Sequence, residues 1–134
     1  MSGAVAAVQA ALVTAIEANA ALMAELTGVY DGPPPRAAFP YLSIAGGGSS
    51  DWSTKTARGR ELRIGLTLWD DGGEAGRMHR LMALIEDAAP GIARDLPGWR
   101  VASIVFVRSL VARDPAGPWA GLIEFRVRAM EAPA

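Results

Sequence analysis

Side chains capable of chemistry are few in this sequence, and their spacing forms no reactive set. The single histidine, His79, falls on the exposed side of a predicted helix. No acid or nucleophile is spaced to act with it, and a lone surface histidine is usually inert. The chain has no cysteine, which excludes disulfides, thiolate catalysis and cysteine-ligated metals. We therefore expect no catalytic residue, no cofactor and no metal site.

Two short motifs have both a functional and a simpler structural interpretation. The pair Asp70-Asp71 suggests metal binding, but acidic residues at a helix start also meet unpaired amides and the helix dipole. Glu74 is correctly spaced to complete a capping box with Asp71. The GGGSS segment at 46–50 lacks the spacing of a phosphate-binding loop, and no helix is predicted after it. Helix capping and an ordinary loop are the favoured interpretations.

Basic and aromatic side chains gather in and beside the polar segment 46–59. Four basic residues there lie close in sequence to Asp51 and Glu61, which favours a solvated surface over a phosphate site. Trp52 is less expected in such a segment, and exposed aromatics are enriched at interfaces. Folding back onto the domain is an equally good alternative for it. With two outward arginines of the last strand, the candidate subunit or tail contacts are Trp52, Lys55, Arg58, Arg60, Arg63, Arg126 and Arg128.

Composition indicates a globular chain. The 134 residues are 51% hydrophobic and 20% charged, enough for one core, and we expect a single domain over 1–134. The net charge of −1 gives no general attraction to nucleic acid or to an anionic membrane. No lysine or arginine precedes Arg36, so the apolar segment 1–27 lacks the basic region of a secretory signal. Polar residues inside that segment argue against a membrane span.

Two amphipathic helices are predicted from apolar side chains at 3.6-residue spacing. The first lies between Ser2 and Gly28, which are suitable caps. Asn19 interrupts its apolar stripe; a bond to neighbouring backbone is the simpler interpretation, and a polar contact with a partner is the alternative. The second helix begins at residue 71 and is stopped by Pro90-Gly91.

Four strands are predicted, over residues 39–45, 60–69, 99–111 and 119–130. The second is the clearest, because apolar and polar residues alternate along its whole length. The third carries Val101, Val105 and Val107 on one predicted face and further apolar residues, Phe106 and Leu110 among them, on the other. This pattern is typical of a central strand or of one covered by a partner. Residues 46–59 are predicted to be a mobile loop, longer than the roughly 4–6 residues of ordinary connections.

The order helix, strand, strand, helix, strand, strand predicts an α+β fold. Two hairpins would form a four-stranded, mainly antiparallel sheet with both helices on one face. Leu66 and Ile85 are expected to be buried between the sheet and the second helix. The other face would carry Arg63, Arg126 and Arg128, and is either solvated or paired with another subunit.

A series of short motifs runs through most of the chain in a fixed order. They are Val29-Tyr30-Asp31, a proline run, Phe39-Pro40-Tyr41, the polar loop, Leu68-Trp69 closing a strand, Glu74 at a helix start, and Gly121-x-x-x-Phe125-Arg126. Together they resemble the small tail-completion, or tail-terminator, proteins of long-tailed bacteriophages and gene transfer agents. That resemblance implies an α+β subunit without catalytic residues, assembled as a ring, often a hexamer, that caps the tail tube and meets the head–tail connector.

The expected function is therefore structural. The protein would end tail-tube growth with three partners: itself, the tail tube protein and the head–tail connector protein. It would assemble in the bacterial cytoplasm and remain at the head-proximal end of the tail, with no membrane and no sequence-specific nucleic acid among its partners. The alternative is a small-molecule-binding or enzymatic α+β domain, which requires a pocket with convergent polar groups.

Overall fold

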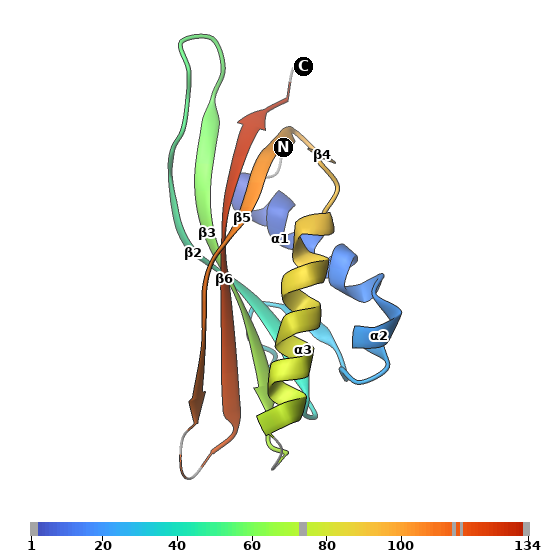
Figure 1. Cartoon of the computed structure of the whole chain (residues 1–134). Helices are drawn as coiled ribbons and strands as arrows, with labels where there is room; N and C mark the ends of the chain where they lie inside the picture. Colours follow the sequence, from blue (N-terminus) through green and yellow to red (C-terminus); the bar gives the residue numbers. More distant parts are fainter. Residues whose placement is uncertain (1–2, 73–74, 114, 116, 133–134) are drawn as a thin grey trace.

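The computed structural model describes residues 3–72, 75–113, 115 and 117–132. The helices are α1 (Ala4–Glu17), the short α2 (Ala20–Met23) and α3 (Ala75–Ala88), which runs into the 3-10 turn η1 (Ala89–Gly91). The strands are β1 (Val29–Asp31), β2 (Tyr41–Asp51), β3 (Gly59–Asp70), β4 (Asp95–Leu96), β5 (Trp99–Arg113) and β6 (Trp119–Glu131). Figure 1 shows a tall, twisted sheet with the helices gathered on one side of it.

The six strands form one curled sheet in the order β1-β2-β3-β6-β5-β4. Two long hairpins, β2–β3 and β5–β6, are joined where β3 pairs with β6, from Gly59 opposite Met130 to Asp70 opposite Trp119. Every pairing is antiparallel except that of β1, which runs parallel to β2. The predicted α+β class is confirmed.

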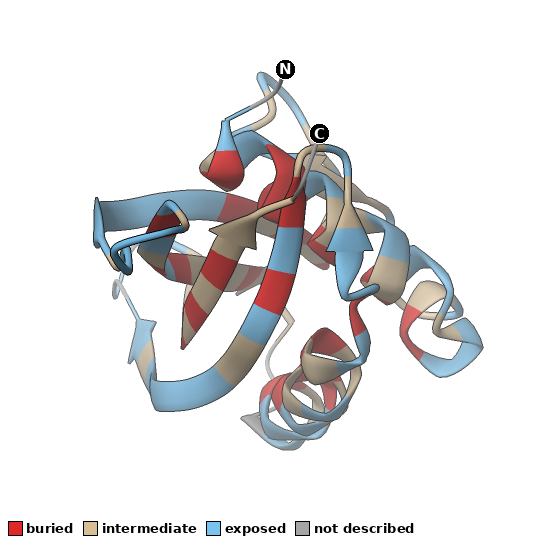
Figure 2. Ribbon diagram, turned by 90° about the horizontal axis from the view of Figure 1, so that it is seen from above, coloured by how far each residue is buried: buried red, intermediate tan, exposed pale blue. Residues whose placement is uncertain are grey.

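The core lies between the sheet and the helices. The inward side chains of residues 62–68 of β3 and 123–129 of β6 are completely buried, and Figure 2 shows the resulting alternation of buried and less buried residues along the strands. Leu66 and Ile85 are both 0% exposed, so the predicted register of β3 and α3 is confirmed. A Cβ atom at Gly121 would lie 2.6 Å from the sulfur of Met82 and 2.7 Å from that of Met78. The glycine therefore leaves the space that these two α3 side chains occupy.

The predicted count of four strands and two helices is wrong, because three further elements are too short to show a periodic spacing of apolar residues. These are β1, β4 and α2. The first helix ends at Glu17 instead of Gly28, and the Asn19 side chain then caps α2 by accepting a 3.0 Å hydrogen bond from the Leu22 amide. Bonding to neighbouring backbone is thus the correct interpretation of Asn19. No described helix is both long enough and apolar enough to cross a lipid bilayer. Ser2 and Glu74, expected to cap helices, lie outside the described residues.

The predicted loop 46–59 is wrong at both ends. Residues 46–51 continue β2, where Ser49 pairs with Leu62 and Asp51 with Arg60, across a bulge between Gly46 and Gly48. Only residues 52–58 form the turn, which is closed by a 2.9 Å hydrogen bond from the Trp52 amide to the Gly59 carbonyl. Glycine and serine are weak strand formers, but the long neighbouring strand supplies backbone partners that override that preference. The mobility of this segment in a free subunit stays a prediction.

The predicted faces of the third strand are also wrong. Two bulges in β5, at 101–103 and 106–108, each shift its register against β6. Leu110 consequently shares the outer face with Val105 instead of sharing a face with Phe106. Phe106 points to the helix side, where its ring meets that of Phe125 edge-on at a centroid distance of 6.1 Å.

Leu66→Ala should lower the free energy of unfolding by about 2–5 kcal/mol, because it opens a cavity at a site that is fully buried. Thr67→Ala is the matched control, since its half-buried side chain lies on the opposite face of the same strand. Chemical denaturation of both variants checks the prediction. Equal stability of the two variants would contradict the assigned core.

Candidate functional site

The outer sheet face, which points away from the helices, carries a layer of charged side chains from three adjacent strands. We call it the arginine–glutamate layer; its members are Glu61, Arg63, Arg108, Glu124, Arg126 and Arg128. Arg128 Nε donates a 2.9 Å hydrogen bond across the strands to Glu61 Oε1. Arg63 and Arg108 approach one oxygen of Glu124 from either side, at 3.4 and 3.7 Å. Three of the four arginines thus pair with the two glutamates.

Arg126 lies at the centre of this layer without its own carboxylate. It stands directly opposite Arg63 on β3 and Val105 on β5. Its Nε atom is buried and has no hydrogen-bond partner in the described part of the chain. Like charges directly opposite each other on neighbouring strands are unfavourable. The layer therefore keeps a positive surplus that an acidic surface would complement.

Trp52 folds back onto the end of this layer. Its side chain is half-buried, and the guanidinium carbon of Arg128 lies 5.4 Å from the centre of the ring. This distance is within the range of a cation–π contact. Of the two alternatives for Trp52, packing on the domain is the one seen in the single chain.

The remaining predicted contact residues lie elsewhere. Arg60 donates to the Ser49 hydroxyl at 3.3 Å on the helix side of the sheet, and Lys55 is exposed in the turn. Arg58 and Arg60 line a polar hollow of about 460 Å³ whose other lining residues include Asp51 and Glu131. The structure therefore brings Trp52, Arg63, Arg126 and Arg128 to the outer face, whereas Arg58 and Arg60 line the polar hollow.

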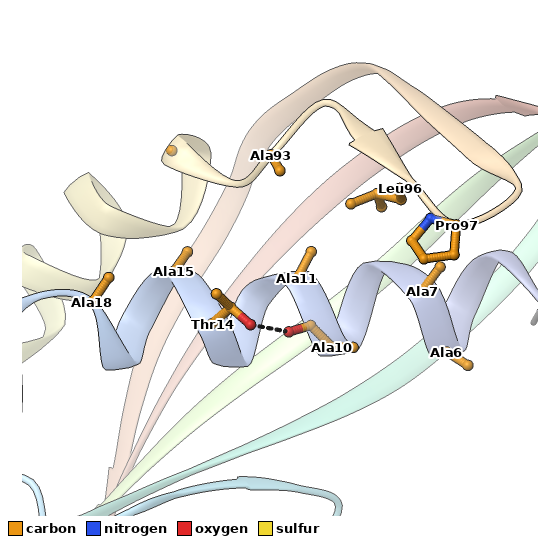
Figure 3. Close-up of a pocket in the computed structure, with 11 residues that line it drawn as sticks. Ala6, Ala7, Ala10, Ala11, Thr14, Ala15, Ala18, Ala93, Leu96 and Pro97 are labelled. Atoms are coloured by element: carbon orange, nitrogen blue, oxygen red, sulfur yellow. Dashed lines mark hydrogen bonds between the residues drawn. The ribbon is translucent and has the colours of Figure 1, made fainter. Parts of the chain in front are cut away.

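A second concavity is almost entirely apolar. A groove of about 500 Å³ lies between α1 and the segment 91–97, with alanines along the helix and Leu96 and Pro97 on the other side. Figure 3 shows Thr14, the one polar side chain among these lining residues, and its hydroxyl donates to the Ala10 carbonyl at 3.2 Å. The groove lacks the convergent polar groups of a small-molecule site.

The reactive candidates form no site. His79 is exposed on α3, as predicted. Within the described residues, no three acidic or histidine side chains come close enough to hold a metal ion. Asp70 is buried and accepts hydrogen bonds from Arg77 Nε at 2.7 Å and from the Gly72 amide at 3.0 Å. The Asp70–Arg77 ion pair therefore links the end of β3 to the first turn of α3.

The exposed part of β5 was not among the predicted contact residues. Four large apolar side chains are well exposed there: Val105 (44%), Phe106 (44%), Val107 (37%) and Leu110 (41%). Among the described residues, β4 pairs with Trp99 and Arg100 alone, and the rest of this strand edge has no strand beside it. In the sequence, these residues were indicated by apolar side chains on both predicted faces of the strand, a pattern that fits either a central strand or one covered by a partner. Because this stretch lies at a sheet edge, the central position is wrong, and cover by a partner stays a prediction. Exposed apolar patches and open edges mark interaction sites.

Comparison with known proteins agrees with a structural role. The profile of the family "Tail completion protein gp17" matches residues 10–130. The chain belongs to this family. A chain in the solved virion of a native gene transfer agent particle has the same fold, with a TM-score of 0.82 and 29% sequence identity, over 96% of this chain and 99% of that one. No curated protein matches. The family resemblance seen in the short motifs is confirmed, and this is a structural protein of the phage-tail type.

Asp70→Asn should lower the free energy of unfolding at pH 7 by about 1–3 kcal/mol, because it breaks a buried hydrogen-bonded ion pair. Burial raises the pKa of Asp70, but hydrogen bonds from Arg77 and Gly72 outweigh it, so the pKa lies below its ordinary value. The stabilisation is therefore present above the unfolded-state pKa and is lost as pH falls through the folded-state pKa. Urea denaturation at neutral pH and at about pH 3 checks this prediction. The lower pH lies below the ordinary aspartate pKa of about 3.9, where the contribution of the ion pair should be reduced.

The exposed neighbour Asp71 provides the control, since Asp71→Asn should change stability little at either pH. A deficit for Asp70→Asn that stayed the same at both pH values would show that the ion pair is not its cause.

Proposed function

We propose that this protein is a tail-terminator ring component that ends the tail tube and joins it to the head–tail connector. The family match over residues 10–130 carries the proposal. The near-complete structural overlap with a chain of a gene transfer agent virion supports it. The partners would be further copies of the chain, the tail tube protein and the head–tail connector protein. The family resemblance implies a ring of six copies.

A purely structural role is consistent with the chemistry of the surface. A ring requires head-to-tail contacts, in which two different surfaces of one subunit are complementary. This chain carries surfaces of different kinds: a charged layer with surplus arginine and an open strand edge with exposed apolar side chains. We propose that the whole chain, 1–134, acts as one domain, which is assembled in the bacterial cytoplasm and kept at the head-proximal end of the phage or gene-transfer-agent particle.

Trp52→Ala and Arg58→Ala should impair ring formation or tail joining, whereas His79→Ala should leave both intact. An aromatic or arginine anchor at an interface can contribute about 2 kcal/mol or more, and a ring repeats the loss at every subunit contact. The measurement is complementation of a deletion, scored by infectious or gene-transferring particles. Because Trp52 also contacts Arg128, its variant must first be shown to unfold at the wild-type temperature.

The same complementation experiment can also contradict the structural proposal. If folded His79→Ala protein gives no particles while the Trp52 and Arg58 variants give normal numbers, a reactive role is favoured over an assembly role. Light scattering during size-exclusion chromatography, with tail tubes added, tests the ring directly. A chain that never exceeds the monomer mass under those conditions would count against it.

A further inference from the structure

The sheet has two open edges, on β2 and on β5; the open segments are displaced along the strands and overlap in part, with Gly48 in the same row as Val105. On one side, β1 pairs only with Leu42–Ile44 of β2, so residues 46–51 have no neighbour on their outer edge among the described residues. On the other side, β4 pairs only with Trp99 and Arg100, so no strand in the described part of the chain lies beside residues 103–113 of β5. Figure 1 shows the free end of β2 at the top of the sheet and the free end of β5 at the bottom.

The two edges have complementary shapes. The β5 edge is bulky and apolar, with Val105, Phe106, Val107 and Leu110 all exposed. The β2 edge has the sequence GGGSSD, and each of its residues is exposed. A Cβ added to Gly48 would meet no atom within 4 Å, so there is free space beside this backbone. At Gly46 and Gly47 an added Cβ would lie 3.2 Å from Val5 and Arg63, so the free space for large side chains of another strand is beside Gly48.

Strand direction also favours a match between these edges. Three antiparallel steps separate β2 from β5, through β3 and β6, so the two strands run in opposite directions within one subunit. A copy rotated about an axis inclined to the strands keeps the alternation of strand direction and also displaces its β2 along the first copy's β5. Its β2 beside the first copy's β5 would therefore continue the antiparallel pattern of the sheet.

We propose that the open edge of β5, residues 103–113, pairs with the 46–51 segment of β2 in a second copy of this chain, so that one sheet continues from subunit to subunit. The displacement of the two edges toward opposite ends is consistent with closure, because strands in a closed sheet must tilt and stagger. The contact is head-to-tail and can close into a ring. This inference rests on the proposed ring and identifies the surfaces that would build it.

A symmetric contact between two β5 edges is the main competitor. It would bury the same apolar side chains, but it is isologous, ends at a dimer and leaves the β2 edge bare. Another protein adding a strand to β5 is the second competitor. The difference in side-chain bulk between the two edges, and the use of both edges by a head-to-tail contact alone, favour β2 of another copy over both.

Site-directed crosslinking can separate these arrangements, because the chain has no cysteine of its own. Ser49→Cys on β2 and Ser109→Cys on β5 both place a thiol on the helix side of the sheet at exposed positions. Particles are assembled in cells that co-express the two single-cysteine proteins and are treated with a short bis-maleimide. Mass spectrometry of the crosslinked peptides then reports which strands meet. Ala83→Cys, exposed on α3, replaces either partner as the control.

The expected result is a crosslink between positions 49 and 109, and loss of crosslinking when position 83 replaces either one. A crosslink between two copies of position 109 would overturn the proposal in favour of a dimer. Crosslinks from position 109 to a different particle protein, or none at all in particles that contain the chain, would also overturn it. If the chain is absent from the particles, the proposed function itself has failed, which is a separate outcome.

A charge substitution provides a second readout. Val107→Lys adds a charge at the open edge and should leave the monomer folded while abolishing incorporation into particles. Ala83→Lys adds the same charge on the exposed side of α3 and should be incorporated normally. Normal incorporation of both variants would contradict the assignment of β5 to the contact.

Discussion

The pairing of β3 with β6 is the interaction on which the rest of the structure depends. It joins two hairpins that are separated in sequence by a whole helix, and it runs the length of both strands. An isolated hairpin is marginally stable in water. Once joined, the two central strands present a continuous apolar surface, including Leu66, Ile123 and Phe125, all completely buried. The helices α1 and α3 then have a surface on which to pack.

The same pairing creates the second face. Because side chains alternate along a strand, each buried residue of β3 and β6 is followed by one that points away from the helices. This places Arg63, Arg126, Arg128 and Glu124 in one layer although they come from strands far apart in the sequence. Each exposed ion pair contributes little stability by itself. The layer matters more for its arrangement, since its positive surplus and the stacked Trp52 define a distinctive surface.

The short strands β1 and β4 explain why so much backbone is left open. Each pairs with only part of its neighbour, and the uncovered parts are residues 46–51 and 103–113. Open edges with exposed apolar side chains favour association, and monomeric proteins usually protect them with charges, prolines or covering loops. The open part of β5 carries Arg108 and a bulge at 106–108, but four large apolar side chains remain exposed beside them. A structural protein can work through backbone and apolar surface alone, which fits a sequence with no cysteine and one exposed histidine.

Some of this was determined by the sequence alone. The strict alternation of 60–69 identified β3 and its faces, and helical spacing placed Ile85 in the core; both features are local, so the chain itself encodes them. The outward placement of Arg63, Arg126 and Arg128 followed from the same alternation. Tertiary structure alone decided that residues 46–51 are strand, that bulges turn Leu110 to the outer face, and that Trp52 rests on Arg128. Glycine and serine extend only because β3 offers them partners, a bulge is defined only against the opposite strand, and an open edge exists only where a neighbouring strand ends. Each depends on residues distant in sequence, which no local pattern records.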